Sequence, residues 1–222
     1  EIKNGQYKLF DLDLNEIERE IQEIDWEVSE AEKAGYDHFM YKEILEQPEV
    51  IERTISGRLE TTSEEIPIKL DQASKYEKIW IVACGTAYHA GLFGKDLFEK
   101  VLGVPVSVEL ASEFRYREPI VGKNDLGIVI SQSGETMDTI AATELLKGNG
   151  AHVLALVNVV GSSLARMADS IFYLHVGPEI GVASTKAYLG MLVGQLLLAK
   201  HWDSANKLDV SFDEIAELPK LI

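Results

Sequence analysis

The stretch Leu126-Gly127-Ile128-Val129-Ile130-Ser131-Gln132-Ser133-Gly134-Glu135-Thr136 decides the fold, because a short apolar run in it passes directly into a loop of hydroxyl and amide side chains. A continuous apolar run of this length is typical of a strand that is buried on both faces of a parallel sheet. Four further segments have this character, two of them strongly and two weakly: residues 79–83, 153–157, 106–108 and 171–174. The sequence therefore predicts five strands.

Helical segments separate these strands along the chain. They are expected near residues 87–101, 136–148, 162–168 and 183–201. Strands that alternate with helices favour an α/β fold, here a three-layer αβα arrangement around a doubly wound, five-stranded parallel sheet. With a strand order of 2-1-3-4-5, the first and third strands would be neighbours where the order reverses, which is where such sheets bind ligands.

The residues before the sheet are expected to form a short hairpin. Its strands would cover residues 7–12 and 16–26, joined by a turn at residues 13–15. A helix would also fit the second segment, because Ile17, Ile21 and Ile24 recur at helical spacing.

A helical linker is expected after the hairpin. Pro48 suits the first turn of a helix, where a missing N–H costs no hydrogen bond. The apolar positions of this helix are expected to be Val50, Ile51, Ile55 and Leu59.

Composition excludes several classes of function. The chain has 222 residues and a formal net charge of −16, which disfavours binding to nucleic-acid phosphates. Its single cysteine, Cys84, fits a reducing, cytoplasmic location and rules out an internal disulfide, and no metal-ligand spacing occurs, so we expect neither metal nor cofactor. No apolar run reaches the length of about 18 residues that a membrane helix needs. The chain starts without Met or a signal peptide, so we expect a piece of a longer protein.

The loop after the third strand is a candidate anion site. It carries the hydroxyls of Ser131, Ser133 and Thr136 and the amide of Gln132 just before a helix. Capping that helix requires only one such side chain, whereas several of them beside free backbone N–H groups make a neutral phosphate cradle. We favour the cradle over capping alone. The loop lacks the lysine of a Walker A motif and the spacing of a dinucleotide-binding loop.

Two further loops could face this one. Gly85 and Thr86 follow the first strand, where a small-residue turn would also be needed for purely structural reasons. The segment Gly181-Val182-Ala183-Ser184-Thr185-Lys186 opens the last helix. Ser184 would cap that helix or meet a ligand hydroxyl, and Lys186 would be either a phosphate partner or a surface charge.

The three loops together resemble those of a sugar isomerase (SIS) domain. The segments Gly35–Met40 and Lys42–Pro48 extend the likeness, so that the chain resembles, more narrowly, the first of two SIS domains in the family of glutamine–fructose-6-phosphate aminotransferases (isomerizing) and the linker before it. Members of that family make glucosamine 6-phosphate and glutamate from fructose 6-phosphate and glutamine, in hexosamine biosynthesis. The resemblance covers most of the chain.

The resemblance implies a set of substrate-binding residues. They would be Gly85, Thr86, Ser131, Gln132, Ser133 and Thr136 around the phosphate, and Val182 and Ser184 along the sugar. Ala87 departs from the family, which usually has a serine there, so one hydroxyl is absent. Because a hydrogen bond contributes roughly 0.5–1.5 kcal/mol, we expect weaker binding rather than loss of the site.

The resemblance also implies a division of the chain. Residues 1–34 would be the end of a glutaminase domain or a linker, 35–77 the linker and N-terminal helices, 78–203 the first SIS domain, and 204–222 a connector toward a second one. The nucleophile and the acid–base groups of the family lie in those other parts, so no catalytic residue is assigned here and we expect these 222 residues to be inactive alone. The expected partners are a sugar phosphate, the rest of the longer chain and a second copy in a homodimer.

Other functions remain open on the residues alone. Glu135 and Glu179 lie near the loops, but each would also stabilise a helix N-terminus without any part in catalysis. A non-catalytic sugar-phosphate sensor would share the serine-rich loop, and a stand-alone aldose–ketose phosphate isomerase would need its own base.

Overall fold

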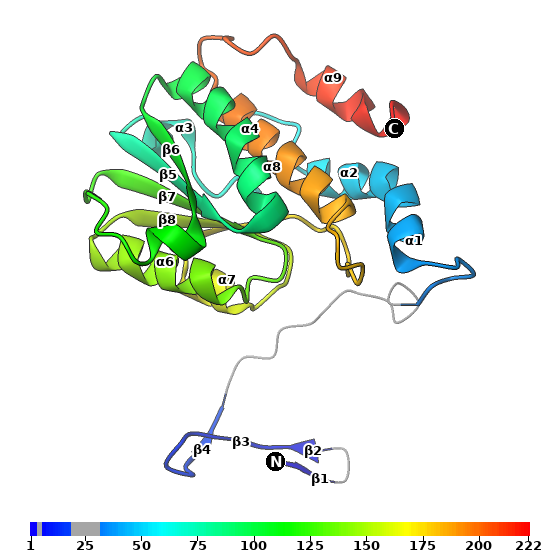
Figure 1. Cartoon of the computed structure of the whole chain (residues 1–222). Coiled ribbons are helices and arrows are strands. Elements are labelled where there is room, and N and C mark those ends of the chain that lie inside the picture. Colours follow the sequence, from blue (N-terminus) through cyan, green and yellow to red (C-terminus); the bar gives the residue numbers. More distant parts are fainter. Residues whose placement is uncertain (4–5, 19–31) are drawn as a thin grey trace.

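A five-stranded parallel sheet forms the centre of the computed structural model, which describes residues 1–3, 6–18 and 32–222 (Figure 1). The strand order is β6-β5-β7-β8-β9, which is the predicted order 2-1-3-4-5. The strands are β5 (Lys78–Ala83), β6 (Val106–Leu110), β7 (Asp125–Ser131), β8 (His152–Val157) and β9 (Ser170–Tyr173). The order reverses between β5 and β7, so the loops that follow these two strands open side by side.

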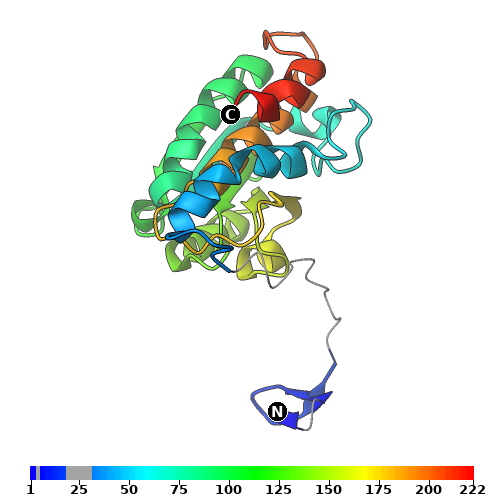
Figure 2. The ribbon, with the colours of Figure 1, turned by 90° about the vertical axis from the view of Figure 1, so that its right-hand side faces the viewer.

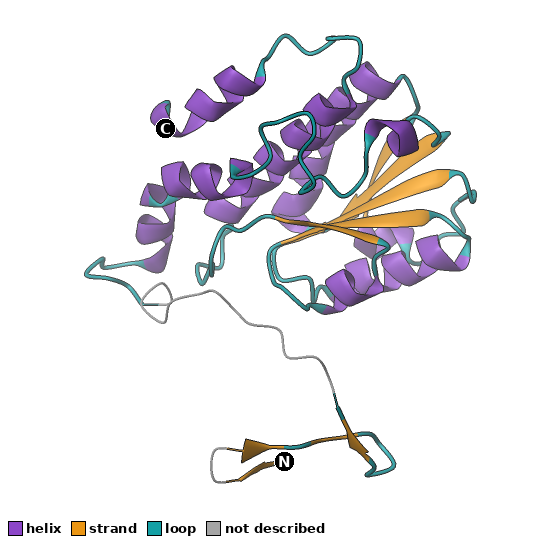
Figure 3. Ribbon diagram, turned by 180° about the vertical axis from the view of Figure 1, so that it is seen from behind, coloured by secondary structure: helices purple, strands orange, loops and turns teal. Residues whose placement is uncertain are grey.

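Each face of the sheet has its own apolar core, because side chains alternate along a strand. Ile79, Ile81 and Ala83 of β5 belong to one buried cluster, whereas Trp80 and Val82 belong to the other. Both faces of β5 are buried, so its apolar run is continuous rather than alternating. The predicted three-layer αβα architecture is confirmed (Figure 3).

The helices divide between the two faces. The first face carries α4 (Gly85–Leu102), α8 (Lys186–Trp202) and α2 (Gln47–Ile55). The second face carries α5 (Ala111–Phe114), α6 (Met137–Gly148) and α7 (Ser163–Met167). Helix α5 was not predicted, since four residues are too few to show a helical period. Helix α8 begins at Lys186 rather than near residue 183 because Thr185 has a non-helical backbone at the N-cap.

The linker forms α1 (Phe39–Leu45) and α2, and α2 packs along α8 (Figure 2). Pro48 lies in the first turn of α2, and Val50, Ile51 and Ile55 are buried, as predicted. Leu59 lies beyond the helix, which ends before Gly57 with φ of +72°. The short helix α3 (Leu70–Ala73) precedes β5, and α9 (Phe212–Glu217) and η2 (Leu218–Lys220) follow α8.

The predicted hairpin is present but shorter than expected. Leu9–Phe10 (β3) pairs antiparallel with Glu16–Ile17 (β4), and the Asp11 carboxylate accepts hydrogen bonds from the amides of Asp13 and Asn15 in the turn. A second pair joins Ile2–Lys3 (β1) to Gln6–Tyr7 (β2). The rest of the predicted second strand, with Ile21 and Ile24, lies outside the described residues.

The stability of the fold is expected to depend on pH through two histidines. Burial lowers the pKa of His152 and of His201 below the ordinary value of 6.5, although Asp169 raises the first and the Arg58 carbonyl raises the second. Below pH 6.5 the unfolded chain therefore binds more protons than the folded one. The free energy of unfolding should fall as the pH drops through this range.

Urea unfolding at pH 7.5 and at pH 5.5 would measure the effect. This range suits the histidines because carboxylates titrate mostly below it. We expect a double variant, His152→Gln with His201→Gln, to lose part of the difference between the two pH values. An undiminished difference in that variant would contradict the assignment to these histidines.

Candidate functional site

The three predicted loops meet in one cleft at the carboxyl ends of β5 and β7. Its volume is about 220 Å³ and it opens to solvent. Predicted residues that line it are Thr86, Ser131, Gln132, Ser133, Thr136, Val182 and Ser184; Ala87 and Glu179 line it as well. Gly85 begins α4 beside the cleft with φ of +57° but is not part of its lining.

The loop 131–136 is held in shape by its own hydroxyls. The Ser131 hydroxyl lies 3.1 Å from that of Thr136 and accepts a hydrogen bond from the Gly134 amide at 3.1 Å. The Ser133 hydroxyl accepts one from the Glu135 amide at 3.2 Å. These bonds fold the loop into a compact turn between β7 and α6.

Capping of α6 does not account for the hydroxyls of this loop. Thr136 occupies the N-cap position, yet in the described part of the chain its side chain makes no capping hydrogen bond and instead meets Ser131. Cys84, the N-cap residue of α4, likewise forms no such bond with the described residues. Two helix N-termini, with their partial positive charge, therefore open toward the cleft without a side-chain cap.

Gly134 allows the loop to approach its neighbours closely. Its φ of +66° lies in the left-handed region, and a Cβ there would overlap the Ser162 side chain, at 2.5 Å from its Cβ. The Gly134 carbonyl accepts a hydrogen bond from the Leu164 amide, and the Gln132 carbonyl accepts one from Asn158. The loop is thus fixed against the β8–α7 connection.

Glu135 and Glu179 both serve helix N-termini. The Glu135 carboxylate accepts a hydrogen bond from the Ser163 amide at 2.7 Å, where α7 begins. Hydrogen bonds from the Ser163 side chain and backbone lower the pKa of Glu135, so it is ionised at neutral pH. Glu179 accepts from the amides of Thr185 and Ala187 at 2.9 and 3.1 Å, at the start of α8.

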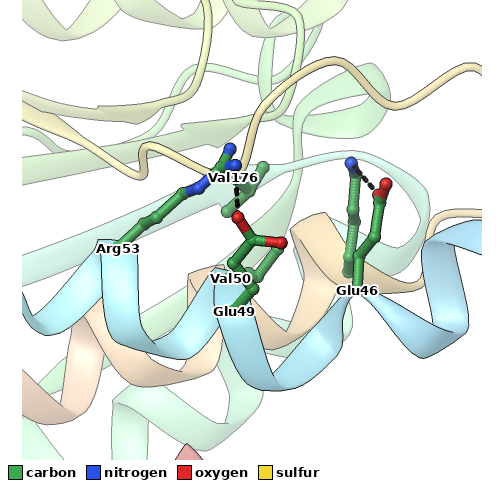
Figure 4. A pocket seen from close by; sticks show the side chains of 6 residues that line it. Glu46, Glu49, Val50, Arg53 and Val176 are labelled. Carbon is green, nitrogen blue, oxygen red and sulfur yellow. Dashed lines mark hydrogen bonds and ion pairs between the residues drawn. The ribbon is translucent and has the colours of Figure 1, made fainter. Parts of the chain in front are cut away.

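Lys186 is neither a phosphate partner in this conformation nor a surface charge. Its side chain is only 4% exposed, and its ammonium lies 2.6 Å from the Glu46 carboxylate, outside the cleft lining. Figure 4 shows a small pocket that Glu46 lines together with Val50 and Val176. A dashed line marks the ion pair between the Glu46 carboxylate and the Lys186 ammonium. The interpretation of Lys186 as a surface charge was therefore wrong, and the described contacts of its ammonium lie away from the cleft.

The third loop offers the cleft one unsatisfied hydroxyl. The Ser184 hydroxyl is buried and has no hydrogen-bond partner among the described residues. The Val182 side chain, in contrast, is fully exposed, so any contact it makes with a ligand would come from the edge of the cleft. Ala87, in the first turn of α4, is buried beside the cleft.

Comparison with known proteins places this arrangement in a family. A family model described as the SIS domain matches residues 73–200, which is more than half of the chain. The chain belongs to the SIS domain family. The resemblance seen in the three loops is confirmed by this match.

Curated relatives that are about half identical to this SIS domain are aminotransferases. The chain is 52% identical to the glutamine–fructose-6-phosphate aminotransferase (isomerizing) of Clostridium tetani over 95% of its length and 35% of the relative's. It is 51% identical to that of Clostridium acetobutylicum, over 91% of this chain and 34% of the other. The chain thus spans about a third of the length of these relatives.

A solved structure supports the same placement. The C-terminal domain of glucosamine-fructose-6-phosphate aminotransferase from Francisella tularensis superposes with a TM-score of 0.72 at 39% identity, covering 86% of this chain and 54% of the other. This likeness extends the match from sequence to three-dimensional fold. The resemblance to glutamine–fructose-6-phosphate aminotransferases (isomerizing) is therefore confirmed as well, whereas the division into residues 1–34, 35–77, 78–203 and 204–222 stays a prediction.

The described residues contain neither a metal-binding cluster nor a membrane-spanning helix. No group of three His, Cys, Asp or Glu side chains within residues 1–3, 6–18 and 32–222 could hold a metal ion. Among the helices that the structure describes, none is both long and apolar enough to cross a membrane.

Sequence reasoning missed four residues that line the cleft of this SIS domain. They are Cys84, Ile130, Gly181 and Met191. Cys84 and Ile130 adjoin the predicted loops and Gly181 lies inside the third, so their position along the chain was a usable signal. Met191 lies more than a turn inside α8, and nothing in its sequence context distinguishes it from a core residue.

Proposed function

We propose that the chain is the sugar-phosphate-binding SIS domain of a glutamine–fructose-6-phosphate aminotransferase (isomerizing), and that its cleft binds fructose 6-phosphate or glucosamine 6-phosphate. The observation that carries this proposal is that two helix N-termini open toward the cleft without a side-chain capping hydrogen bond from the described residues. The Thr136 side chain turns away from capping α6, and α4 begins beside it with no side-chain cap among the described residues. Backbone N–H groups arranged in this way bind phosphate.

The cleft orients the sugar phosphate. The phosphate lies among Thr86, Ser131, Gln132, Ser133 and Thr136, next to Gly85, where the N-termini of α4 and α6 attract it locally despite the net charge of −16. The sugar extends toward Val182 and Ser184, and the unpartnered Ser184 hydroxyl binds one of its hydroxyls. Buried hydroxyls without partners are rare, so a ligand is the natural acceptor or donor here.

The cleft lining supports binding rather than acid–base chemistry. Among the described residues that line it, Glu179 is the one carboxylate, and its Oε1 already accepts two amide hydrogen bonds. A general base must reach the proton that it removes. We therefore propose that the reacting groups come from other parts of a longer chain. We further propose that this longer protein is a homodimer and that it works in the cytoplasm.

Changing Ser133 to Ala should weaken the binding of fructose 6-phosphate about tenfold or more. The variant removes one hydroxyl from the phosphate cradle, and a hydrogen bond to a charged group contributes about 1.5–3 kcal/mol. Isothermal titration calorimetry of the 222-residue chain would measure the dissociation constants. Ser74→Ala, an exposed serine before the sheet, is the matched control and should bind like the wild type.

Two results would count against the proposal. The first is a wild-type chain that does not bind fructose 6-phosphate. The second is an equal dissociation constant for wild type and Ser133→Ala, which would place the phosphate elsewhere.

A further inference from the structure

The third loop of the cleft is held from outside the sheet, by helix α1. Glu43 of α1 is only 2% exposed, and its Oε1 accepts hydrogen bonds from the amides of Ile180 and Gly181 at 2.6 and 3.0 Å. Val182 and Ser184, which line the cleft, follow directly. A side chain in the linker therefore fixes the backbone from which this wall of the cleft is built.

The contact between Glu43 and the loop is close. A Cβ on Gly181 would lie 2.5 Å from Glu43 Oε2, so no larger residue fits there without a shift. Oε2 is itself buried and has no hydrogen-bond partner among the described residues. Burying a carboxylate costs free energy that its hydrogen bonds must offset. The two hydrogen bonds that offset this cost are the ones that fix the backbone of the loop at Ile180 and Gly181.

A buried ion pair anchors the far end of the same loop. Lys186 begins α8, where the helix dipole disfavours a positive charge, and Glu46 compensates it at 2.6 Å. Glu46 lies at the junction of α1 and α2, three residues after Glu43 (Figure 4). Lys42 of α1 adds a second positive charge, 3.5 Å from Glu46. The short linker segment from Lys42 to Glu46 thus contacts the loop at both ends.

We propose that Glu43 is a positioning residue for sugar recognition, which rests on the proposed function of the cleft. It sets the conformation of residues 180–184 and does not touch the ligand. The phosphate cradle, residues 131–136, is held by its own hydrogen bonds and by bonds to the β8–α7 connection, and no hydrogen bond joins it to Glu43 among the described residues. Loss of Glu43 should therefore weaken recognition of the sugar and spare that of the phosphate.

The test compares two ligands on three forms of the 222-residue chain. We expect Glu43→Ala to weaken fructose 6-phosphate about tenfold, as loss of two charge-assisted hydrogen bonds would. The dissociation constant of inorganic phosphate, measured by NMR titration, should change less than twofold. Glu43→Gln retains an acceptor oxygen and should restore most of the affinity for fructose 6-phosphate. A role limited to general stability would not separate the two ligands in this way.

Two further variants keep the test decisive. Gly181→Ala reaches the same contact from the loop side and should reproduce the selective loss, even if Glu43→Ala folds poorly. Glu49→Gln, an exposed glutamate of α2 paired with Arg53, is the matched control and should bind both ligands normally. Equal affinity for fructose 6-phosphate in the wild type, Glu43→Ala and Gly181→Ala would overturn the inference about Glu43 but leave the proposed function standing. A wild type that binds phosphate but not fructose 6-phosphate would instead overturn the proposed function.

Discussion

Replacing Trp202 with alanine is expected to lower the free energy of unfolding by about 3–5 kcal/mol, the usual cost of removing a buried large aromatic side chain. Trp202 is fully buried near the end of α8. Its ring lies 5.1 Å from that of Phe98 in α4, and its Nε1 donates a hydrogen bond to the Ile68 carbonyl at 2.8 Å. The substitution would leave a cavity between α4 and α8 and a buried carbonyl without its donor.

Urea denaturation followed by circular dichroism would measure this loss at pH 7.5, where the histidines do not contribute. Leu221→Ala removes an apolar side chain that is 76% exposed and should change the stability by less than about 0.5 kcal/mol. A loss below about 1 kcal/mol for Trp202→Ala would mean that this side of the core is not packed as described.

The second large effect is expected at Gly134. Gly134→Ala should weaken the binding of fructose 6-phosphate at least tenfold and destabilise the chain by about 1–3 kcal/mol. Two physical causes act together: a φ of +66° that alanine adopts poorly, and overlap of the new Cβ with the Ser162 side chain. Relief of that overlap requires the cradle to move away from α7, which separates Ser131 from the Gly134 amide.

Gly148→Ala is the matched control for this prediction. A Cβ at Gly148 meets no described atom within 4 Å, and the residue lies in the last turn of α6. Alanine there should be neutral or stabilise by up to about 1 kcal/mol, with unchanged ligand affinity. Calorimetry and denaturation of both variants would check the pair. Unchanged affinity in Gly134→Ala would show that ligand binding does not depend on the shape of this loop.

The sheet and the meeting of its loops could be predicted from the sequence because both depend on local patterns. Apolar runs such as 126–130 mark strands buried on both faces, and polar residues directly after them mark the carboxyl ends. The strand order 2-1-3-4-5, one of the common orders of such folds, then brings loops 84–87 and 131–136 together. Short elements escaped prediction, since α5 and α9 contain too few residues for a recognisable period.

What could not be predicted rests on contacts between distant residues. Lys186 looked like a free cation because its partner, Glu46, lies 140 residues earlier in the chain. Glu43 gave no signal of its own, since an acidic residue on a linker helix is ordinarily exposed. Only the packing of α2 along α8 brings both glutamates to the third loop. Whether a charged side chain is buried depends on the folded structure, and no local sequence pattern predicts it.

Glu179 makes the two walls of the cleft differ in electrostatic potential. The N-terminus of α8 carries a partial charge of roughly +0.5, and the full negative charge of the Glu179 carboxylate, bonded to its amides, outweighs it. The opposite wall has the N-termini of α4 and α6, and neither makes a side-chain capping hydrogen bond with the described residues. A ligand that is anionic at one end and neutral at the other consequently has one favourable orientation in this cleft, and the reversed orientation would place like charges together.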